Sequence, residues 1–254
     1  MRELRPRDKT VAIIAVDPSS RNTGGALLGD RIRIRSGASD AGVFIRSMAA
    51  RDQLGGLAES TWAGVTIVAA AFDWVFVETV GVGQSESEIA TLVDTLVYVT
   101  SPETGDLLQF MKAGILELPD VFVVNKSDLG TAAARTASEL RGGVSLGERS
   151  QSRPDPTVIL ASARDGAGVR ELVSAIDAHR QHQLENDSLR DKRLRGRATQ
   201  ITKTLERRYG SFGIERLGGR QALRERVRAD GAASSVTLLE RLGHEIEDVL
   251  QKPR

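Results

Sequence analysis

The sequence predicts an α/β domain with a mostly parallel sheet, followed by a C-terminal helical arm. Five short apolar runs lie in the first two thirds of the chain, and none alternates between apolar and polar residues. Helical patterns separate these runs, which indicates a parallel sheet covered on both faces. Beyond residue 184 the pattern is helical and charged. We therefore divide the chain into an α/β domain, 1–183, and a helical arm, 184–254, a candidate dimerisation element.

The strands are expected where apolar runs meet turn signals. The first, 11–16 (VAIIAV), closes at Asp17-Pro18, and the second, 74–77 (WVFV), runs directly into Glu78-Thr79. Further strands are expected at 94–99, 120–124 and 157–160, with helices at 55–71, 85–92, 105–118, 131–140, 169–182 and 236–250. Residues 19–50 are rich in glycine and small polar residues, and we expect a long loop region there.

Composition excludes several kinds of site. The 254 residues contain no cysteine, which excludes disulfides, thiolate metal sites and cysteine nucleophiles. Three histidines leave little material for a histidine metal site. No apolar run has the length of a membrane span and no secretory leader opens the chain, so we expect a cytoplasmic protein without a membrane segment. The net charge of +1 points to no particular partner.

The loops that follow the strands carry the candidate chemistry, because ligands of parallel sheets bind beyond the carboxyl ends of the strands. Asn125-Lys126-Ser127-Asp128 follows the fourth apolar run and matches the NKxD pattern that recognises guanine in GTPases. The Asp128 carboxylate can accept two hydrogen bonds from the guanine edge, a donor pair that adenine lacks. Asn125 would brace the loop, and the stem of Lys126 would cover the ring. A plain turn is the alternative interpretation.

The loop after the fifth strand extends this pattern. Ala161-Ser162-Ala163 suits the accompanying loop, in which a backbone N–H meets the guanine oxygen, so Ser162 and Ala163 join the candidate site.

Carboxylates and glycines at two other strand ends suit a magnesium–phosphate site. Glu78 ends the WVFV strand and is our candidate catalytic acid, since it could position the attacking water or hold a Mg²⁺-bound water. Gly81 and Gly83 would let backbone N–H groups approach a γ-phosphate. Asp17 and Asp30 supply further carboxylates for Mg²⁺, which prefers oxygen ligands. A turn cap for Asp17 and a solvated loop acid for Asp30 are the alternatives.

Three blocks of the sequence resemble one family. They are VAIIAVDPSSRNTGGALLGDRIRI, FVETVGVGQSE and GDLLQFMKAGILELPDVFVVNKSD, and together they resemble the MeaB/ArgK group of P-loop GTPases over residues 11–178. The resemblance implies a sheet of the SIMIBI type, GTP and GDP as ligands, Mg²⁺ and homodimers. It also implies a chaperone role for a cobalamin-dependent acyl-CoA mutase such as methylmalonyl-CoA mutase.

The same resemblance assigns roles to individual residues. Asp17 and Asp30 match acids around Mg²⁺, and Glu78 matches the acid of the second switch. Asp106, Gln109 and Lys112 match a mobile segment that couples the nucleotide state to the mutase, with an ordinary helix N-terminus as the alternative for that segment.

One family motif is absent from the sequence. No G-x-x-x-x-G-K-[ST] segment occurs, and the family carries this phosphate-binding loop on a central strand before the VAIIAV run. Two interpretations remain open: an N-terminally incomplete form of a working GTPase, or a pseudo-GTPase that binds a partner without turnover. We leave the enzyme assignment undecided at this point.

Two features of the helical arm are left without an assigned role. Residues 189–229 hold 13 Lys or Arg against 4 Asp or Glu, a local charge of +9. A solvated helical face is the simplest interpretation, and a docking surface for an acidic partner or nucleic acid is the alternative. Aromatic residues are sparse there, which gives little support to base stacking and so to nucleic acid as the partner. The leucine stripe of 236–250 fits either packing on the chain itself or a dimer interface.

Overall fold

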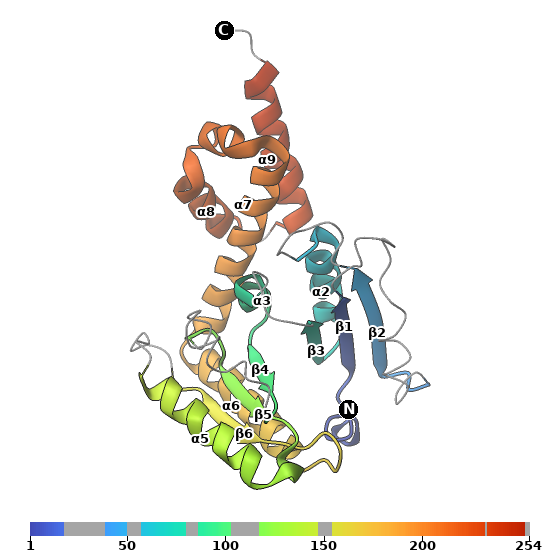
Figure 1. Ribbon diagram of the computed structural model, residues 1–254. Coiled ribbons are helices and arrows are strands. Elements are labelled where there is room, and N and C mark those ends of the chain that lie inside the picture. Colours follow the sequence, from blue (N-terminus) through green and yellow to red (C-terminus); the bar gives the residue numbers. More distant parts are fainter. Residues whose placement is uncertain are drawn as a thin grey trace, which may run out of the picture. The chain divides into compact units, whose positions relative to one another are not determined.

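The computed structural model describes residues 1–17, 39–49, 57–79, 86–102, 117–146, 154–231 and 233–251 (Figure 1). The chain forms two compact units, residues 1–181 and 182–254. The α/β architecture predicted from the apolar runs is confirmed, with six parallel strands among the described residues of the first unit and helices in the second. None of the helices in the described ranges is long and apolar enough to cross a membrane.

The first sheet has the strand order β2-β1-β3. Strand β1 (Val11–Asp17) lies in the centre, between β2 (Val43–Ala49) and β3 (Trp74–Thr79). Helix α2 (Glu59–Ala71) packs on this sheet, and so does helix α3 (Glu86–Leu92) through Ile89. A short 3-10 turn, η1 (Arg5–Arg7), precedes β1. The central position explains why the VAIIAV run is apolar throughout, since side chains on both faces of β1 are covered.

The sequence predicts no strand within the loop-rich region 19–50, whereas residues 43–49 form β2. Among the described strands it pairs with β1 alone, and its described side chains are half-buried or exposed, with Phe44 at 39%. A strand at a sheet edge needs no continuous apolar run, so its sequence VFIRSMA gave a weak signal.

The second sheet has the strand order β4-β5-β6. Strand β5 (Val121–Val124) is fully buried between β4 (Val97–Thr100) and β6 (Thr157–Leu160). Helix α5 (Thr131–Leu146) covers one face through Ala133, Ala137 and Leu140. Helix α6 (Val169–Glu185) packs against Val121, Val123 and Ile159. The turn η3 (Ser127–Leu129) follows β5.

The sequence predicts one parallel sheet, whereas the described strands form two sheets of three. In the part of the chain that the structure describes, β3 pairs with β1 alone and β4 with β5 alone. Val99 of β4 is 58% exposed, although parallel strands are usually covered. Helix α6 serves both sheets, because its Val173 packs with Leu4 and Val11.

A buried polar group fastens α6 to the second sheet. His179 Nδ1 lies 2.8 Å from the Thr95 hydroxyl, and its Nε2 lies 3.3 Å from Asp120 Oδ1. The other Asp120 oxygen accepts the N–H of Leu96 at 2.8 Å. The side chains of His179 and Asp120 are only 10% and 3% exposed. The imidazole therefore holds the start of β4 and β5 against the helix.

Replacing His179 by alanine is expected to lower the free energy of unfolding of the first unit by about 2–3 kcal/mol, because the buried Asp120 and the half-buried Thr95 each lose a partner. Both tryptophans, Trp62 and Trp74, lie in this unit, so denaturant unfolding followed by tryptophan fluorescence measures the effect. His182→Ala, an exposed histidine of the same helix, is the matched control and should change little. Equal stability of the two variants would contradict this role for His179.

The second unit has its own hydrophobic core. Helices α7 (Ser188–Arg216), α8 (Gly219–Ala229) and α9 (Ser235–Gln251) bury ten apolar residues together, among them Leu205, Leu223 and Leu242. Gly210 breaks the helical geometry of α7 with φ 70° and ψ −177°, a conformation that favours glycine. Within the stripe of α9, Leu238, Leu242 and Ile246 are fully buried in this core. These three residues therefore pack on the chain itself.

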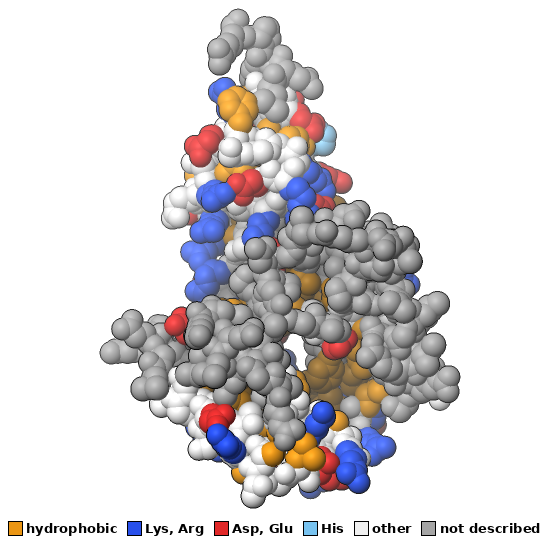
Figure 2. Space-filling view, viewed as in Figure 1, with side chains coloured by type: hydrophobic (Ala, Val, Ile, Leu, Met, Phe, Trp, Pro, Cys, Tyr) orange, Lys and Arg blue, Asp and Glu red, His pale blue; other side chains and the backbone are white. Residues whose placement is uncertain are grey.

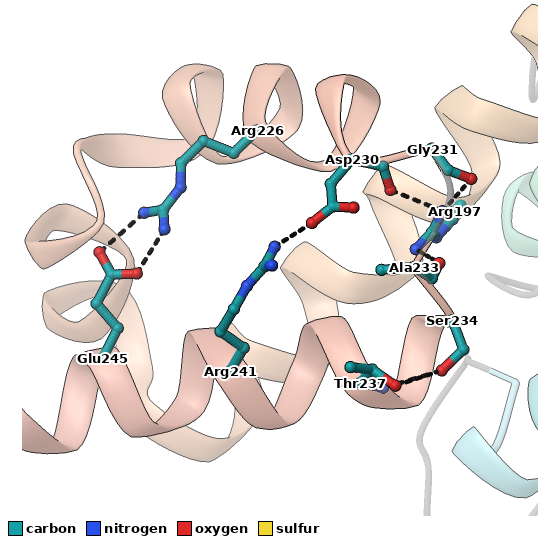
Figure 3. Close-up of polar contacts among 9 residues, drawn as sticks. All are labelled: Arg197, Arg226, Asp230, Gly231, Ala233, Ser234, Thr237, Arg241 and Glu245. Carbon is teal, nitrogen blue, oxygen red and sulfur yellow. Dashed lines mark hydrogen bonds and ion pairs between the residues drawn. The ribbon is translucent and has the colours of Figure 1, made fainter.

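Many of the basic residues in this unit face acids of the same unit. Arg226 forms two hydrogen bonds with Glu245, and Arg241 pairs with Asp230 (Figure 3). The guanidinium of Arg197 donates to three backbone carbonyls between α8 and α9, those of Asp230, Gly231 and Ala233. Figure 2 shows other Lys and Arg side chains on the surface of the helical unit. These pairings favour a solvated, internally paired helical face over a dedicated docking surface.

Candidate functional site

The loops after β5 and β6 lie side by side at the carboxyl end of the second sheet. Val124 and Leu160 are register partners, and the Ala161 N–H donates to the Val124 carbonyl at 2.9 Å. One step further, the Ser127 N–H donates to the Ala161 carbonyl at 3.0 Å. The two predicted guanine loops, NKSD and ASA, are therefore joined by backbone hydrogen bonds.

Asn125 adds a side-chain bridge between the loops. Its Oδ1 accepts the Ala163 N–H at 3.0 Å, and its own N–H donates to the Thr100 carbonyl at 2.8 Å. The expected bracing role of this asparagine thus matches its contacts. The Ala163 N–H is already engaged, so it would have to exchange or share this bond to meet a guanine oxygen.

Asp128 is held in place from two sides. Its Oδ1 accepts the Ser162 hydroxyl at 2.9 Å, and its Oδ2 accepts Nη1 of Arg164 at 3.3 Å. Ser162 is fully buried, whereas the Asp128 side chain remains 21% exposed. The Ser162 hydrogen bond, with smaller contributions from the backbone N–H of Asp128 and from Arg164, lowers the pKa of Asp128 below its ordinary value. The carboxylate therefore has a partner on each oxygen, and both partners favour its charged form.

Replacing Ser162 by alanine is expected to raise the pKa of Asp128 toward its ordinary value, because the strongest bond to the charged form is lost. Since the folded-state pKa is depressed, the stabilisation is present above the unfolded pKa and is lost as the pH falls through the folded value. Carboxyl ¹³C titration of Asp128 measures the shift. Ser127→Ala in the neighbouring turn is the control, and an unchanged pKa in Ser162→Ala would contradict the assignment.

Lys126 adopts a left-handed backbone conformation, with φ 59° and ψ 40°. Such a conformation costs a non-glycine residue on the order of 1–2 kcal/mol and is concentrated at functional sites. It turns the chain directly from β5 into η3, which carries Asp128, while the Lys126 side chain remains exposed. A ring-covering role for its stem is compatible with this exposure.

The first sheet brings two of the candidate magnesium ligands to one edge. Glu78 pairs with Ala15 and Thr79 with Val16, so the backbone of Asp17, the next residue of β1, lies at the same carboxyl end as Glu78. Glu78 is exposed. Mg²⁺ usually takes one or two carboxylates together with phosphate oxygens and waters, and Glu78 is one candidate at this end of the sheet. Among the described side chains, no group of three metal-ligating residues occurs.

Several predicted site residues lie outside the described residues: Asp30, Gly81, Gly83, Asp106, Gln109 and Lys112. The assignments made for them remain predictions.

Two residues of the site escaped the sequence analysis. Arg164 reaches Asp128, and its only signal was its place directly after the ASA triplet. Gly168 has φ +73°, and a Cβ there would lie 2.0 Å from the Leu160 carbonyl oxygen. The glycine spacing in ARDGAGV could have indicated this close approach between the loop and β6.

The chain is similar in sequence to named GTPases. A Pyrococcus horikoshii protein that bears the name "Putative GTPase" is 44% identical over 208 residues, which is 81% of this chain and 65% of that protein. The mitochondrial methylmalonic aciduria type A homolog of Mus musculus is 36% identical over 193 residues, 75% of this chain and 46% of that protein. The chain thus spans less than two thirds of the length of these relatives.

A solved structure supports the fold. The crystal structure of LAO/AO transport system kinase matches with a TM-score of 0.59 at 24% identity, over 99% of this chain and 75% of that chain. The family model described as methylmalonyl Co-A mutase-associated GTPase MeaB matches residues 1–209. The parallel architecture and this match over residues 1–209 together show that the chain belongs to the MeaB family of GTPases.

Proposed function

We propose that this protein binds GTP and GDP through its guanine base, and that its family activity is Mg²⁺-dependent GTP hydrolysis in support of a cobalamin-dependent methylmalonyl-CoA or related acyl-CoA mutase. The arrangement of Asn125, Asp128 and Ser162 carries the first part, because it presents a charged, pre-positioned carboxylate at a sheet edge. Guanine offers that carboxylate two donors, and adenine cannot. Binding of GDP in preference to ADP is the test.

For hydrolysis we propose Glu78 as the residue that orients water or a Mg²⁺-bound water. Mg²⁺, when bound, would neutralise charge on the phosphates, and Asp17, Asp30 and Glu78 would hold it. Gly81 and Gly83 would bring backbone N–H groups to the γ-phosphate. The position of Glu78 at the carboxyl end of β3, level with the end of β1, supports this role.

Replacing Glu78 by alanine is expected to reduce GTP hydrolysis about 10²-fold or more while guanine binding survives, because the acid acts on the phosphate side. Single-turnover phosphate release measures hydrolysis, and calorimetry with GDP measures binding. Glu139→Ala, an exposed carboxylate on α5, is the control. Wild-type turnover by Glu78→Ala would show that the role is wrongly assigned.

We propose a cobalamin-dependent mutase as partner, contacted in a nucleotide-dependent way through the segment with Asp106, Gln109 and Lys112. The description of the matching family, a methylmalonyl Co-A mutase-associated GTPase, supports the partner. Sedimentation with methylmalonyl-CoA mutase should show a complex whose affinity differs between GDP and GTP. By resemblance we further propose a cytoplasmic homodimer, for which light scattering should give about twice 27.4 kDa.

The alternative is a partner-binding pseudo-GTPase without turnover. The sequence contains no Walker A motif, and β3 and β4 each have a single neighbour among the described strands. A further parallel strand that paired with both β3 and β4 would join the two sheets. Such a strand could also carry a phosphate-binding loop at its end. Guanine binding without measurable phosphate release by the 254-residue chain would favour this alternative.

A further inference from the structure

Two different environments meet at the Asp128 carboxylate. On the interior side the Ser162 hydroxyl holds Oδ1, and Ser162 has no solvent exposure. On the other side Nη1 of Arg164 contacts Oδ2, and the Arg164 side chain is 83% exposed. A ligand that reaches Asp128 from solvent therefore meets the carboxylate on the side that Arg164 occupies.

A guanine edge needs acceptor capacity on both oxygens, since its N1–H and exocyclic amine point in parallel toward a carboxylate. Ser162 donates one hydrogen bond to Oδ1, and a carboxylate oxygen can accept two. Arg164 uses the solvent side of Oδ2, the place that the second guanine donor requires. The backbone around Arg164 is fixed by a tight turn, in which the Gly166 N–H donates to the Ser162 carbonyl at 2.9 Å.

We propose that Arg164 competes with guanine for Asp128, so that nucleotide binding requires the Arg164–Asp128 ion pair to open. This inference rests on the proposed guanine site and assigns a regulator of its affinity within the same loop. The pair suits such a gate because it is long, at 3.3 Å, and its Arg164 side chain is 83% exposed, so that opening it costs little. The pair also keeps the carboxylate partnered when no base is bound.

Competition by an exposed ion pair has a distinctive salt dependence. Salt screens Arg164 from Asp128, whereas guanosine is uncharged and its hydrogen bonds respond weakly to salt. The affinity of the wild-type chain for guanosine should therefore rise when the salt concentration increases from about 0.1 M to about 1 M, where the Debye length falls from about 10 Å to about 3 Å.

The experiment is a guanosine titration of the ¹⁵N-labelled 254-residue chain, followed by NMR at both salt concentrations. Arg164→Ala should bind guanosine up to about fivefold more tightly than wild type at low salt, and its affinity should lose the rise with salt. Arg135→Ala is the matched control, because the Arg135 side chain is also 83% exposed and pairs with Glu139 at 3.0 Å. This control should behave as wild type.

Two results would overturn the proposal. Unchanged or weaker guanosine binding by Arg164→Ala, with wild-type binding intact, refutes competition while leaving the guanine site standing. If the folded wild-type chain binds neither guanosine nor GDP, the proposed function itself fails and the competition fails with it.

Discussion

Replacement of Asp128 by asparagine is expected to exchange guanine selectivity for xanthine selectivity. The variant keeps the shape of the side chain but replaces one acceptor by an amide donor, which would face the exocyclic amine of guanine. Xanthine carries a carbonyl at that position and can accept from the amide. Hydrogen bonds to a charged group are worth about 1.5–3 kcal/mol each, so GDP affinity should fall by about 10²-fold. Calorimetry with GDP and xanthosine diphosphate measures both effects.

The control for this exchange is Asp155→Asn, an exposed carboxylate before β6 and outside both loops. It should bind GDP as the wild type does. If Asp128→Asn retained wild-type affinity for GDP, the carboxylate would not be the group that recognises the guanine base. The Ser162–Asp128 contact would then be a structural tie between two loops.

Replacement of Gly168 by alanine is expected to destabilise the first unit by about 3 kcal/mol or more. A Cβ there would lie 2.0 Å from the Leu160 carbonyl oxygen and 2.9 Å from the Ala161 Cα, both backbone atoms that cannot rotate away. The φ of +73° adds strain for any residue with a side chain. Because the clash falls directly before Ser162, the variant should also lose guanine binding. Urea unfolding followed by tryptophan fluorescence measures the stability loss.

Gly166→Ala separates the steric clash of the added Cβ from the strain of a positive φ. Its φ is +88°, yet a Cβ there meets nothing within 4 Å. This variant should therefore lose only about 1–2 kcal/mol, the cost of a left-handed conformation for an L residue. Similar losses in both variants would show that the loop moves away from β6 without cost, contrary to the close approach described above.

The buried strands and the two candidate loops after β5 and β6 could be predicted from sequence because one local pattern encodes each. The apolar run of β5 is buried on both faces, and the polar NKSD follows it without a spacer. The edge strand β2 could not, because partial exposure leaves no apolar run to detect. The predicted end of a helix also differs from the observed one, since α2 begins at Glu59 rather than near Gly55.

Features that depend on contacts between distant segments were beyond the sequence analysis. The pairing of Arg164 with Asp128 spans 36 residues, and that of Arg226 with Glu245 spans 19. The charge count of 189–229 gave the excess of basic residues but could not show which acids face them. The division of the described strands into two three-stranded sheets could not be predicted either, because the apolar run of a strand does not show which other strands pair with it.

The central claim is that this chain carries a guanine-selective site, and calorimetry on the 254-residue chain tests it most directly. GDP and GTP would be titrated with Mg²⁺ present, with ATP as the control nucleotide and Asp128→Ala as the control protein. We expect guanine nucleotides to bind, ATP not to bind, and Asp128→Ala to lose both guanine nucleotides together. A folded chain that binds no nucleotide, or that binds ATP as tightly as GTP, would contradict the account.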